Sequence, residues 1–157
     1  MNANELNPQI WDIFKLWEHY LIYWDSTKKE YLDKILKDKN IKSIITDPPY
    51  WVDYVKSKKW FYWENTNHKD IENDEFQSEE QYKEFTKKWL EIAKPYLDNK
   101  NSFYIFNSDK MIFSLKQAIE ESNYKFTQML IWVKNWWVIW RLDYLPQHEL
   151  IAYGWYW

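Results

Sequence analysis

Hydrophobic residues along this chain alternate between short continuous runs and longer stretches with helical spacing. The short runs predict strands at 20–24, 43–46, 102–107, 126–134 and 149–154. Apolar residues three and four positions apart predict helices from 27 to about 39, from 78 to near 95 and from 108 to about 123. Because the first strand, first helix and second strand follow one another directly, they favour a parallel crossover, right-handed by the general rule.

Polar residues at the helix ends refine these bounds. Thr27 and Ser78 each stand three positions before a Glu or Gln, which predicts a capping box at both helices. Asn40 is suited to end the first helix in a left-handed conformation. Ser108 or Asp109 is suited to cap the third helix.

The second predicted strand runs into an unusual set of hydrogen-bonding groups. A buried β-branched run at 44–46 is followed directly by Asp47, Pro48, Pro49 and Tyr50. Neither proline can donate a backbone hydrogen bond, so their carbonyls face outward as acceptors. The Asp47 carboxylate adds another acceptor, and Tyr50 adds a flat ring for stacking. This set suits an exocyclic amine on a planar ring, because two acceptors on its hydrogens aim the nitrogen lone pair at an electrophile.

The tetrad Asp47-Pro48-Pro49-Tyr50 resembles the catalytic motif of the amino-group methyltransferases that modify adenine N6 or cytosine N4 in DNA. Residues 20–26 resemble the strand and Gly-Asp motif that precedes the catalytic strand in a permuted group of these enzymes. Segments 102–107, 130–135 and 148–154 resemble later strands of that group, in the expected order. The resemblance covers about residues 19–157.

This resemblance implies an α/β fold, a Rossmann-like methyltransferase sheet with helices on both faces, and S-adenosylmethionine as cofactor. The Asp form of the motif usually accompanies adenine, so it implies methyl transfer to adenine N6 of double-stranded DNA after base flipping. By the same resemblance, Asp47 and the Pro48 carbonyl hold the amine, Tyr50 stacks on the base, and Asp25, Ser26 and Asp47 contact the cofactor. From the residues alone, Asp25 or Ser26 can equally cap the next helix.

No Phe-x-Gly-x-Gly cofactor loop occurs, and in the permuted group the cofactor-binding strands follow the catalytic half. We therefore interpret residues 1–18 as a polar lead-in with a short amphipathic turn, and residues 19–157 as the N-terminal catalytic half of a longer methyltransferase. In an incomplete sheet, strand 20–24 is expected not to sit beside strand 43–46, and strand edges stay exposed or pair differently. We expect this chain alone to bind S-adenosylmethionine weakly or not at all, and to be inactive.

Other readings of the same residues stay open. Cytosine-N4 or RNA amine methylation fits the same scaffold, and so does a non-enzymatic binding module that keeps the tetrad without a cofactor site. A hydrolase or metal enzyme is poorly supported, because the chain has no Gly-x-Ser-x-Gly elbow, no paired histidines and no cysteine. His148 and Glu149, at the start of the last strand, either join the site or finish a turn.

The long polar segment 51–77 is interpreted as a loop that covers the flipped base. It carries Lys56, Lys58 and Lys59, the best basic patch for a DNA partner, and His68, which we interpret as solvated rather than catalytic. No metal site is predicted, since no second histidine or carboxylate has ligand spacing with His68.

The composition says more about the partners and location of the protein than about its chemistry. The chain has 157 residues, a net charge of −3 and no cysteine, so DNA binding would depend on local patches rather than global charge. No apolar run approaches the ~20 residues of a membrane span. We expect a cytoplasmic protein with no membrane partner; the oligomeric state cannot be read from the sequence.

Glycine and tryptophan usage is abnormal. A chain of this length would carry roughly 11 glycines at ~7% usage, yet it has 1 glycine and 13 tryptophans. We hypothesise that the gene uses UGA for glycine and that UGA was translated as tryptophan. The tryptophans that stand where glycine is favoured are Trp24, Trp51, Trp60, Trp63, Trp140 and Trp157, with Trp17 and one of Trp136 and Trp137 as further suspects. Those that fit apolar or family-like contexts are Trp11, Trp89, Trp132 and Trp155.

Overall fold

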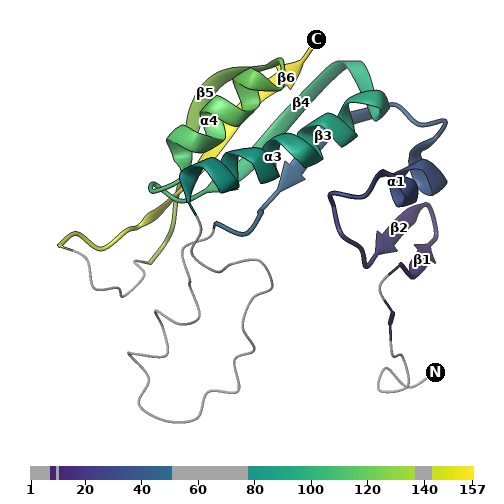
Figure 1. The fold of residues 1–157 in the computed structure, drawn as a ribbon. Helices are drawn as coiled ribbons and strands as arrows, with labels where there is room; N and C mark the ends of the chain where they lie inside the picture. The colour runs from purple at the N-terminus through teal and green to yellow at the C-terminus, as the bar shows by residue number, and fades with distance from the viewer. Residues whose placement is uncertain (1–7, 10, 51–77, 137–142) are drawn as a thin grey trace.

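The computed structural model describes residues 8–9, 11–50, 78–136 and 143–157. Within them the chain forms a small N-terminal unit and a larger sheet covered by helices (Figure 1). The N-terminal unit is a two-stranded antiparallel hairpin, β1 (Ile13–Leu16) and β2 (His19–Ile22), followed by helix α1 (Lys29–Leu36).

The larger sheet has four strands: β3 (Ile41–Thr46), β4 (Leu97–Asn107), β5 (Tyr124–Val133) and β6 (His148–Tyr156). Their order is β3-β4-β6-β5. Strand β3 runs parallel to β4, whereas β6 is antiparallel to both β4 and β5. The carboxyl ends of β3 and β4 therefore meet at the same edge of the sheet.

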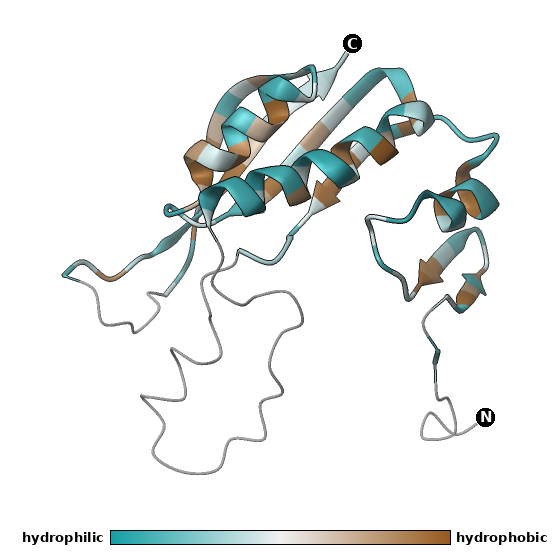
Figure 2. Ribbon diagram, viewed as in Figure 1, coloured by the Kyte–Doolittle hydropathy of each residue, from teal (hydrophilic) through white to brown (hydrophobic). Residues whose placement is uncertain are grey.

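Helices α3 (Glu79–Ala93) and α4 (Ile112–Glu121) pack side by side on this sheet, and the short helix η2 (Lys94–Tyr96) leads from α3 into β4 (Figure 1). Hydrophobic positions recur between hydrophilic ones along both helices (Figure 2). They meet the inward residues of β4 and β6 in one core, whose buried members are Tyr82, Leu90, Phe103, Ile105, Met111, Leu115, Ile119, Tyr124 and Ala152.

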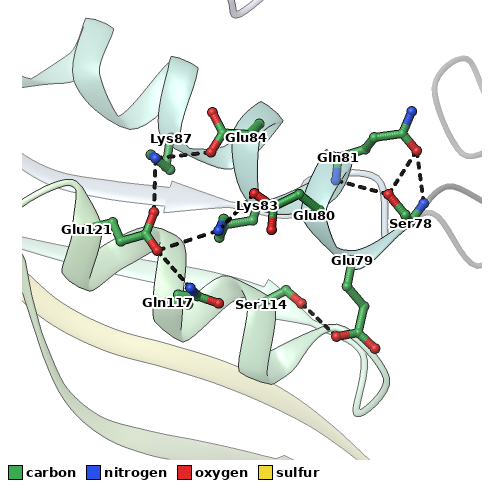
Figure 3. A network of polar contacts seen from close by, with 10 residues as sticks. All are labelled: Ser78, Glu79, Glu80, Gln81, Lys83, Glu84, Lys87, Ser114, Gln117 and Glu121. Carbon is green, nitrogen blue, oxygen red and sulfur yellow. Dashed lines mark hydrogen bonds and ion pairs between the residues drawn. The ribbon is translucent and has the colours of Figure 1, made fainter.

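Polar contacts fix α3 against α4. Ser78 accepts a hydrogen bond from the Gln81 backbone N–H, and the Gln81 side chain accepts one from the Ser78 backbone N–H, so the predicted capping box is present (Figure 3). Further along, the Lys83 and Lys87 ammonium groups lie 3.5 and 2.9 Å from carboxylate oxygens of Glu121 on α4. One acidic residue on α4 thus joins two turns of α3 (Figure 3).

The sheet face away from α3 and α4 carries a series of aromatic side chains. Tyr104 lies 5.1 Å from Tyr153 between ring centroids, and Phe106 lies 5.9 Å from Trp132. Trp132 is 56% exposed, and Ile45 on the neighbouring edge strand is 73% exposed. In the part of the chain that the structure describes, this face is therefore less covered than the other.

Gly154 in β6 is at a position that admits no side chain. A Cβ atom there would lie 1.8 Å from the Lys125 carbonyl oxygen on β5 and 2.6 Å from the Phe103 ring on β4. The close approach of the three strands at this point requires glycine.

The carboxyl-terminal elements confirm the predicted pattern. The strands predicted at 43–46, 102–107, 126–134 and 149–154 all form, and most are longer than predicted. The helix from 78 ends at η2, which contains Pro95. Asn123 has a φ of 59° after α4, but neither Ser108 nor Asp109 caps that helix, because Met111 occupies the N-cap position.

The amino-terminal predictions are partly wrong. Residues 13–16 form a strand instead of an amphipathic turn, and β2 is largely exposed instead of buried. Because β2 pairs with β1, no parallel crossover joins it to β3, although the expectation that these strands would not sit side by side is confirmed. Thr27 does not cap α1, and Asn40 does not have a positive φ.

Strand β3 is likewise an edge strand in the described residues, not the buried strand that its β-branched run predicts. Sequence patterns do not reveal which strands lie beside a given one, so they cannot separate an edge from a centre. Several predictions lie outside the described residues. They are the loop at 51–77 with Lys56, Lys58, Lys59 and His68, and the tryptophans Trp51, Trp60, Trp63, Trp137 and Trp140.

Candidate active site

The tetrad is positioned by the end of β3. This strand ends at Thr46, which is paired with Ile105 on β4, and Asp47 follows directly. Ligands in open α/β sheets bind beyond the carboxyl ends of the strands. The two prolines hold the chain extended at this edge, because they lack N–H groups to continue the ladder.

Asp47 and Tyr50 contact each other through their side chains. The Tyr50 hydroxyl donates a hydrogen bond to Asp47 Oδ1. Asp47 is exposed, whereas Pro48, Pro49 and Tyr50 are half-buried. Burial raises the pKa of the Tyr50 hydroxyl well above its usual range, and the bond to Asp47 raises it further. Tyr50 is therefore a neutral donor that keeps one carboxylate oxygen of Asp47 in place.

A cavity of about 400 Å³ lies beside the tetrad. Sites for small molecules and cofactors occupy roughly 300–1,000 Å³, so this cavity is large enough for such a ligand. It is mostly apolar, with a few polar groups at the tetrad end. Its lining residues come from the turn before α1 (Trp24, Ser26), from α1 (Leu32, Leu36), from β3 and the tetrad (Ile41, Ile44, Thr46, Asp47, Pro48, Pro49), from α3 (Phe85, Trp89, Ala93) and from the segment after it (Tyr96, Leu97).

The structure brings together two of the three residues predicted to contact a cofactor. Ser26 and Asp47 both line the cavity. Asp25 lies between two lining residues, and its Oδ1 accepts hydrogen bonds from the backbone N–H and the hydroxyl of Thr27, at 2.9 and 2.7 Å. The Thr27 hydroxyl is the main reason that the pKa of Asp25 is lowered. Asp25 therefore shapes the turn before α1, and neither it nor Ser26 is the N-cap of α1, which is Lys28.

Comparison with known families decides what kind of protein carries this site. A family model described as "DNA methylase", whose name covers N6 and N4 methyltransferases, matches residues 41–155. The chain belongs to the DNA methylase family. The match begins with β3 and includes the tetrad, β4, β5 and most of β6, but not α1 or the turn before it, which also line the cavity.

Two solved structures share the fold of this chain. The structure titled "crystal structure of M1.HpyAVI-SAM complex" is 18% identical, with a TM-score of 0.51, over 82% of this chain and 50% of that chain. The structure titled "crystal structure of M1.HpyAVI" is 16% identical, with a TM-score of 0.53, over 84% of this chain and 54% of that chain. Both matches confirm the predicted α/β methyltransferase fold. The chain spans about half the length of these relatives, and no curated protein matches it.

One buried pair near Tyr50 was not singled out by the sequence. Asn107 ends β4 and is 1% exposed, and its Nδ2 donates a hydrogen bond of 2.6 Å to the hydroxyl of Tyr82, which is 0% exposed. The Asn107 Oδ1 atom is buried without a hydrogen-bond partner in the described part of the chain. Asn107 could have been singled out from the sequence, because it is a polar residue at the end of an apolar strand, as Asp47 is at the end of β3.

Glu149 lies near the DNA methylase tetrad, while His148 beside it is exposed. Glu149 at the start of β6 forms an ion pair with Lys134, just after β5. Its charge also contributes to the raised pKa of Tyr50, after burial and Asp47. Glu149 therefore lies close enough to Tyr50 for its charge to act on that hydroxyl.

The described residues lack two kinds of feature. They contain no group of three or more His, Cys, Asp or Glu side chains that could hold a metal ion. They also contain no helix long and apolar enough to cross a membrane.

Proposed function

We propose that this chain carries the catalytic motif of a DNA methyltransferase that transfers a methyl group from S-adenosylmethionine to adenine N6. The observation that supports this most is the position of the Asp47–Tyr50 tetrad at the carboxyl end of β3, with Asp47, Pro48 and Pro49 on the wall of a cavity of about 400 Å³. The family match supports the reaction class, and the Asp form of the tetrad favours adenine.

The amine is held by acceptors from the tetrad. The Asp47 carboxylate accepts one N6 hydrogen and the Pro48 carbonyl accepts the other, so the nitrogen lone pair leaves the ring plane. For this the base must be extruded from the duplex. The half-buried Tyr50 ring offers it a face to stack on, with a contribution of about 1–3 kcal/mol per stacked base.

The residues that line the cavity suit the proposed cofactor. Apolar and aromatic residues such as Trp89 and Phe85 suit the flat base of an adenosine, while Ser26 and Asp47 supply hydrogen-bonding groups at one end. When bound, S-adenosylmethionine supplies an electrophilic methyl on a sulfonium. The chain itself orients the amine and excludes water on the apolar side. No metal is needed, since neither role requires a Lewis acid.

Tyr50 has a further role in this proposal. In the structure its hydroxyl bonds to Asp47 Oδ1, the group that would accept the N6 hydrogen. A tyrosine hydroxyl is neutral near pH 7 and so does not repel the carboxylate, and the raised pKa of Tyr50 keeps this true at alkaline pH as well. The carboxylate is therefore oriented before the base arrives, and substrate binding only has to exchange or share one hydrogen bond.

The test of base identity is product analysis with the complete product of the gene that encodes this chain. Unmethylated DNA is incubated with that protein and S-adenosylmethionine, digested to nucleosides and analysed by mass spectrometry, with an RNA substrate in parallel. We expect N6-methyladenine in DNA. N4-methylcytosine in DNA would show that the target is cytosine N4 instead of adenine N6. Methylated RNA would show that RNA is the substrate. If neither DNA nor RNA is methylated, the enzymatic proposal is contradicted.

A further inference from the structure

Trp17 occupies a backbone position that favours glycine. The hairpin register pairs Leu16 with His19, so Trp17 and Glu18 form a two-residue loop between β1 and β2. Trp17 has a φ of 56°, in the left-handed region. The tight turns of two-residue hairpins need positive φ at the first loop position and are dominated by Gly, Asn and Asp. A bulky side chain is a genuine outlier there.

The Trp17 side chain does not compensate for this strain. It is 90% exposed, so it buries almost no surface that could offset an unfavourable backbone. Trp11 also has a positive φ, 93°, but its ring stacks on Tyr31 with centroids 4.0 Å apart. Trp11 thus has a packing role that Trp17 lacks. The positive φ of Trp11 nevertheless counts against the interpretation from sequence that Trp11 is a genuine tryptophan.

Trp24 is unfavourable for a different reason. Its indole lines the cavity beside Asp47, Pro48 and Pro49, and so takes up space next to the tetrad. Its Nε1 atom is buried without a hydrogen-bond partner among the residues that the structure describes, and the same is true of Trp89, so what distinguishes Trp24 is that it does not belong to the core packing around α3. A buried N–H without an acceptor costs about 1–3 kcal/mol. Here a large side chain reduces the candidate ligand site and also leaves a polar group unsatisfied.

We propose that positions 17 and 24 are glycine in the native protein, and that glycine at 24 opens the cavity beside Asp47 for the cofactor. The coding explanation is a UGA codon that the host reads as glycine, which also accounts for 13 tryptophans beside 1 glycine. Trp89 and Trp132 remain tryptophan, because Trp89 packs on the core from the middle of α3 and Trp132 contacts Phe106. The claim about the cofactor rests on the proposed function, whereas the claim about glycine does not.

Thermal unfolding tests position 17 without any ligand. At ordinary negative φ, glycine is less stable than alanine by roughly 0.5–1 kcal/mol, but at positive φ that preference reverses. Trp17→Gly is therefore expected to melt at a higher temperature than Trp17→Ala. Trp136 is the matched control, since it is 69% exposed and is not among the residues with positive φ. There the glycine variant should melt lower than the alanine variant. A lower melting temperature for Trp17→Gly than for Trp17→Ala would overturn the proposal.

Ligand binding tests position 24. We compare Trp24→Gly with Trp24→Phe in the complete gene product, by calorimetry with S-adenosylmethionine. Phe removes the unpaired N–H but still fills the cavity, so only the glycine variant should gain affinity, by about 10-fold or more. Equal affinity of the two variants would overturn the role of position 24. If neither the parent protein nor either variant binds S-adenosylmethionine, the result counts against the proposed cofactor. The claim that position 24 is glycine is then decided by the codons.

The codons give the most direct answer. We expect UGA at positions 17 and 24 and UGG at 89 and 132, and peptide masses from the native protein that carry glycine at the first two positions. UGG at 17 and 24 overturns the proposal. So does UGA at all four positions with tryptophan in the native peptides, because that would mean the host reads UGA as tryptophan.

Discussion

At the scale of single residues, Tyr50 links the site's electrostatics to its expected chemistry. Its hydroxyl donates to Asp47, and its ring is half-buried beside the same carboxylate. The sequence predicted the ring's stacking role but not this hydrogen bond, because residue spacing alone does not fix a side-chain rotamer. The two functions can be separated by substitution.

Tyr50→Phe and Tyr50→Ala form a matched pair for this purpose. Tyr50→Phe keeps the ring and loses only the bond to Asp47, so we expect unfolding free energy to fall by about 0.5–1.5 kcal/mol and DNA affinity to change little. Tyr50→Ala also loses the stacking face, so DNA affinity should fall by about 1–3 kcal/mol, or roughly 5- to 150-fold. Urea denaturation and DNA titration at fixed salt measure both. Equal DNA affinity of the two variants would contradict a stacking role.

Tyr82 supports the same edge from inside the core. Because its hydroxyl accepts from the buried Asn107 amide, Tyr82→Phe leaves that amide without its acceptor. We expect the unfolding free energy to fall by about 1–3 kcal/mol, measured by urea denaturation. Tyr144→Phe is the control, because Tyr144 is 90% exposed and its change should stay within about 0.5 kcal/mol. If Tyr82→Phe and Tyr144→Phe lower the unfolding free energy by the same amount, the Asn107–Tyr82 hydrogen bond makes no contribution to stability.

At the scale of elements, one acidic residue joins α1 to the segment before β4. Asp33 Oδ1 accepts from the Lys29 ammonium at 2.5 Å and from the Tyr96 hydroxyl at 2.6 Å. Lys29 first, and then Tyr96, hold the pKa of Asp33 below its ordinary value of 3.8. The folded state thus binds a proton at Asp33 less readily than the unfolded state does. The contribution of Asp33 to folding stability is therefore complete above the ordinary pKa, and it is lost as pH falls through the lowered pKa of the folded state.

Asp33→Asn tests this contact between elements. We expect the parent chain to lose stability relative to Asp33→Asn as pH falls below about 4, and the difference between the two to be constant near neutral pH. Urea midpoints across that range give the comparison. A difference that stays the same at all pH values would show that the Asp33 charge makes no contribution.

Gly154 controls the packing of β6 between its neighbours. A methyl group there would overlap the Lys125 carbonyl oxygen, so Gly154→Ala should lower the unfolding free energy by about 3 kcal/mol or more, or prevent folding. Ala152→Gly is the control on the same strand, with an expected loss of about 1 kcal/mol. Circular dichroism and urea denaturation measure both. A fully stable Gly154→Ala protein would contradict the register of β5 and β6.

At the scale of the whole molecule, the sequence was most informative where pattern and tertiary structure agree. From β3 onward, apolar runs and helical spacing predicted the four strands β3 to β6 and the helices α3 and α4, although not the short helix η2 or the edge position of β3. The amino-terminal part was predicted poorly. There, β2 reads as a buried strand but pairs only with β1 in the described residues, and no local pattern specifies its partner.

The site follows the same division. The position of the tetrad could be predicted, because its four residues are adjacent in sequence and directly follow the apolar run of β3. The cavity could not be predicted, because its walls come from α1, β3 and α3, which are distant in sequence. The Asn107–Tyr82 pair was missed for the same reason, since its members belong to β4 and α3.

The central claim is that the Asp47 carboxylate holds the amine for methyl transfer. Its most direct test is the single-turnover methylation rate of Asp47→Asn in the complete gene product, with thermal unfolding measured on the same sample. Because Asp47 is exposed, we expect an unchanged melting temperature and a rate lowered by about 100-fold or more. A folded Asp47→Asn protein that methylates at the parent rate would contradict the account.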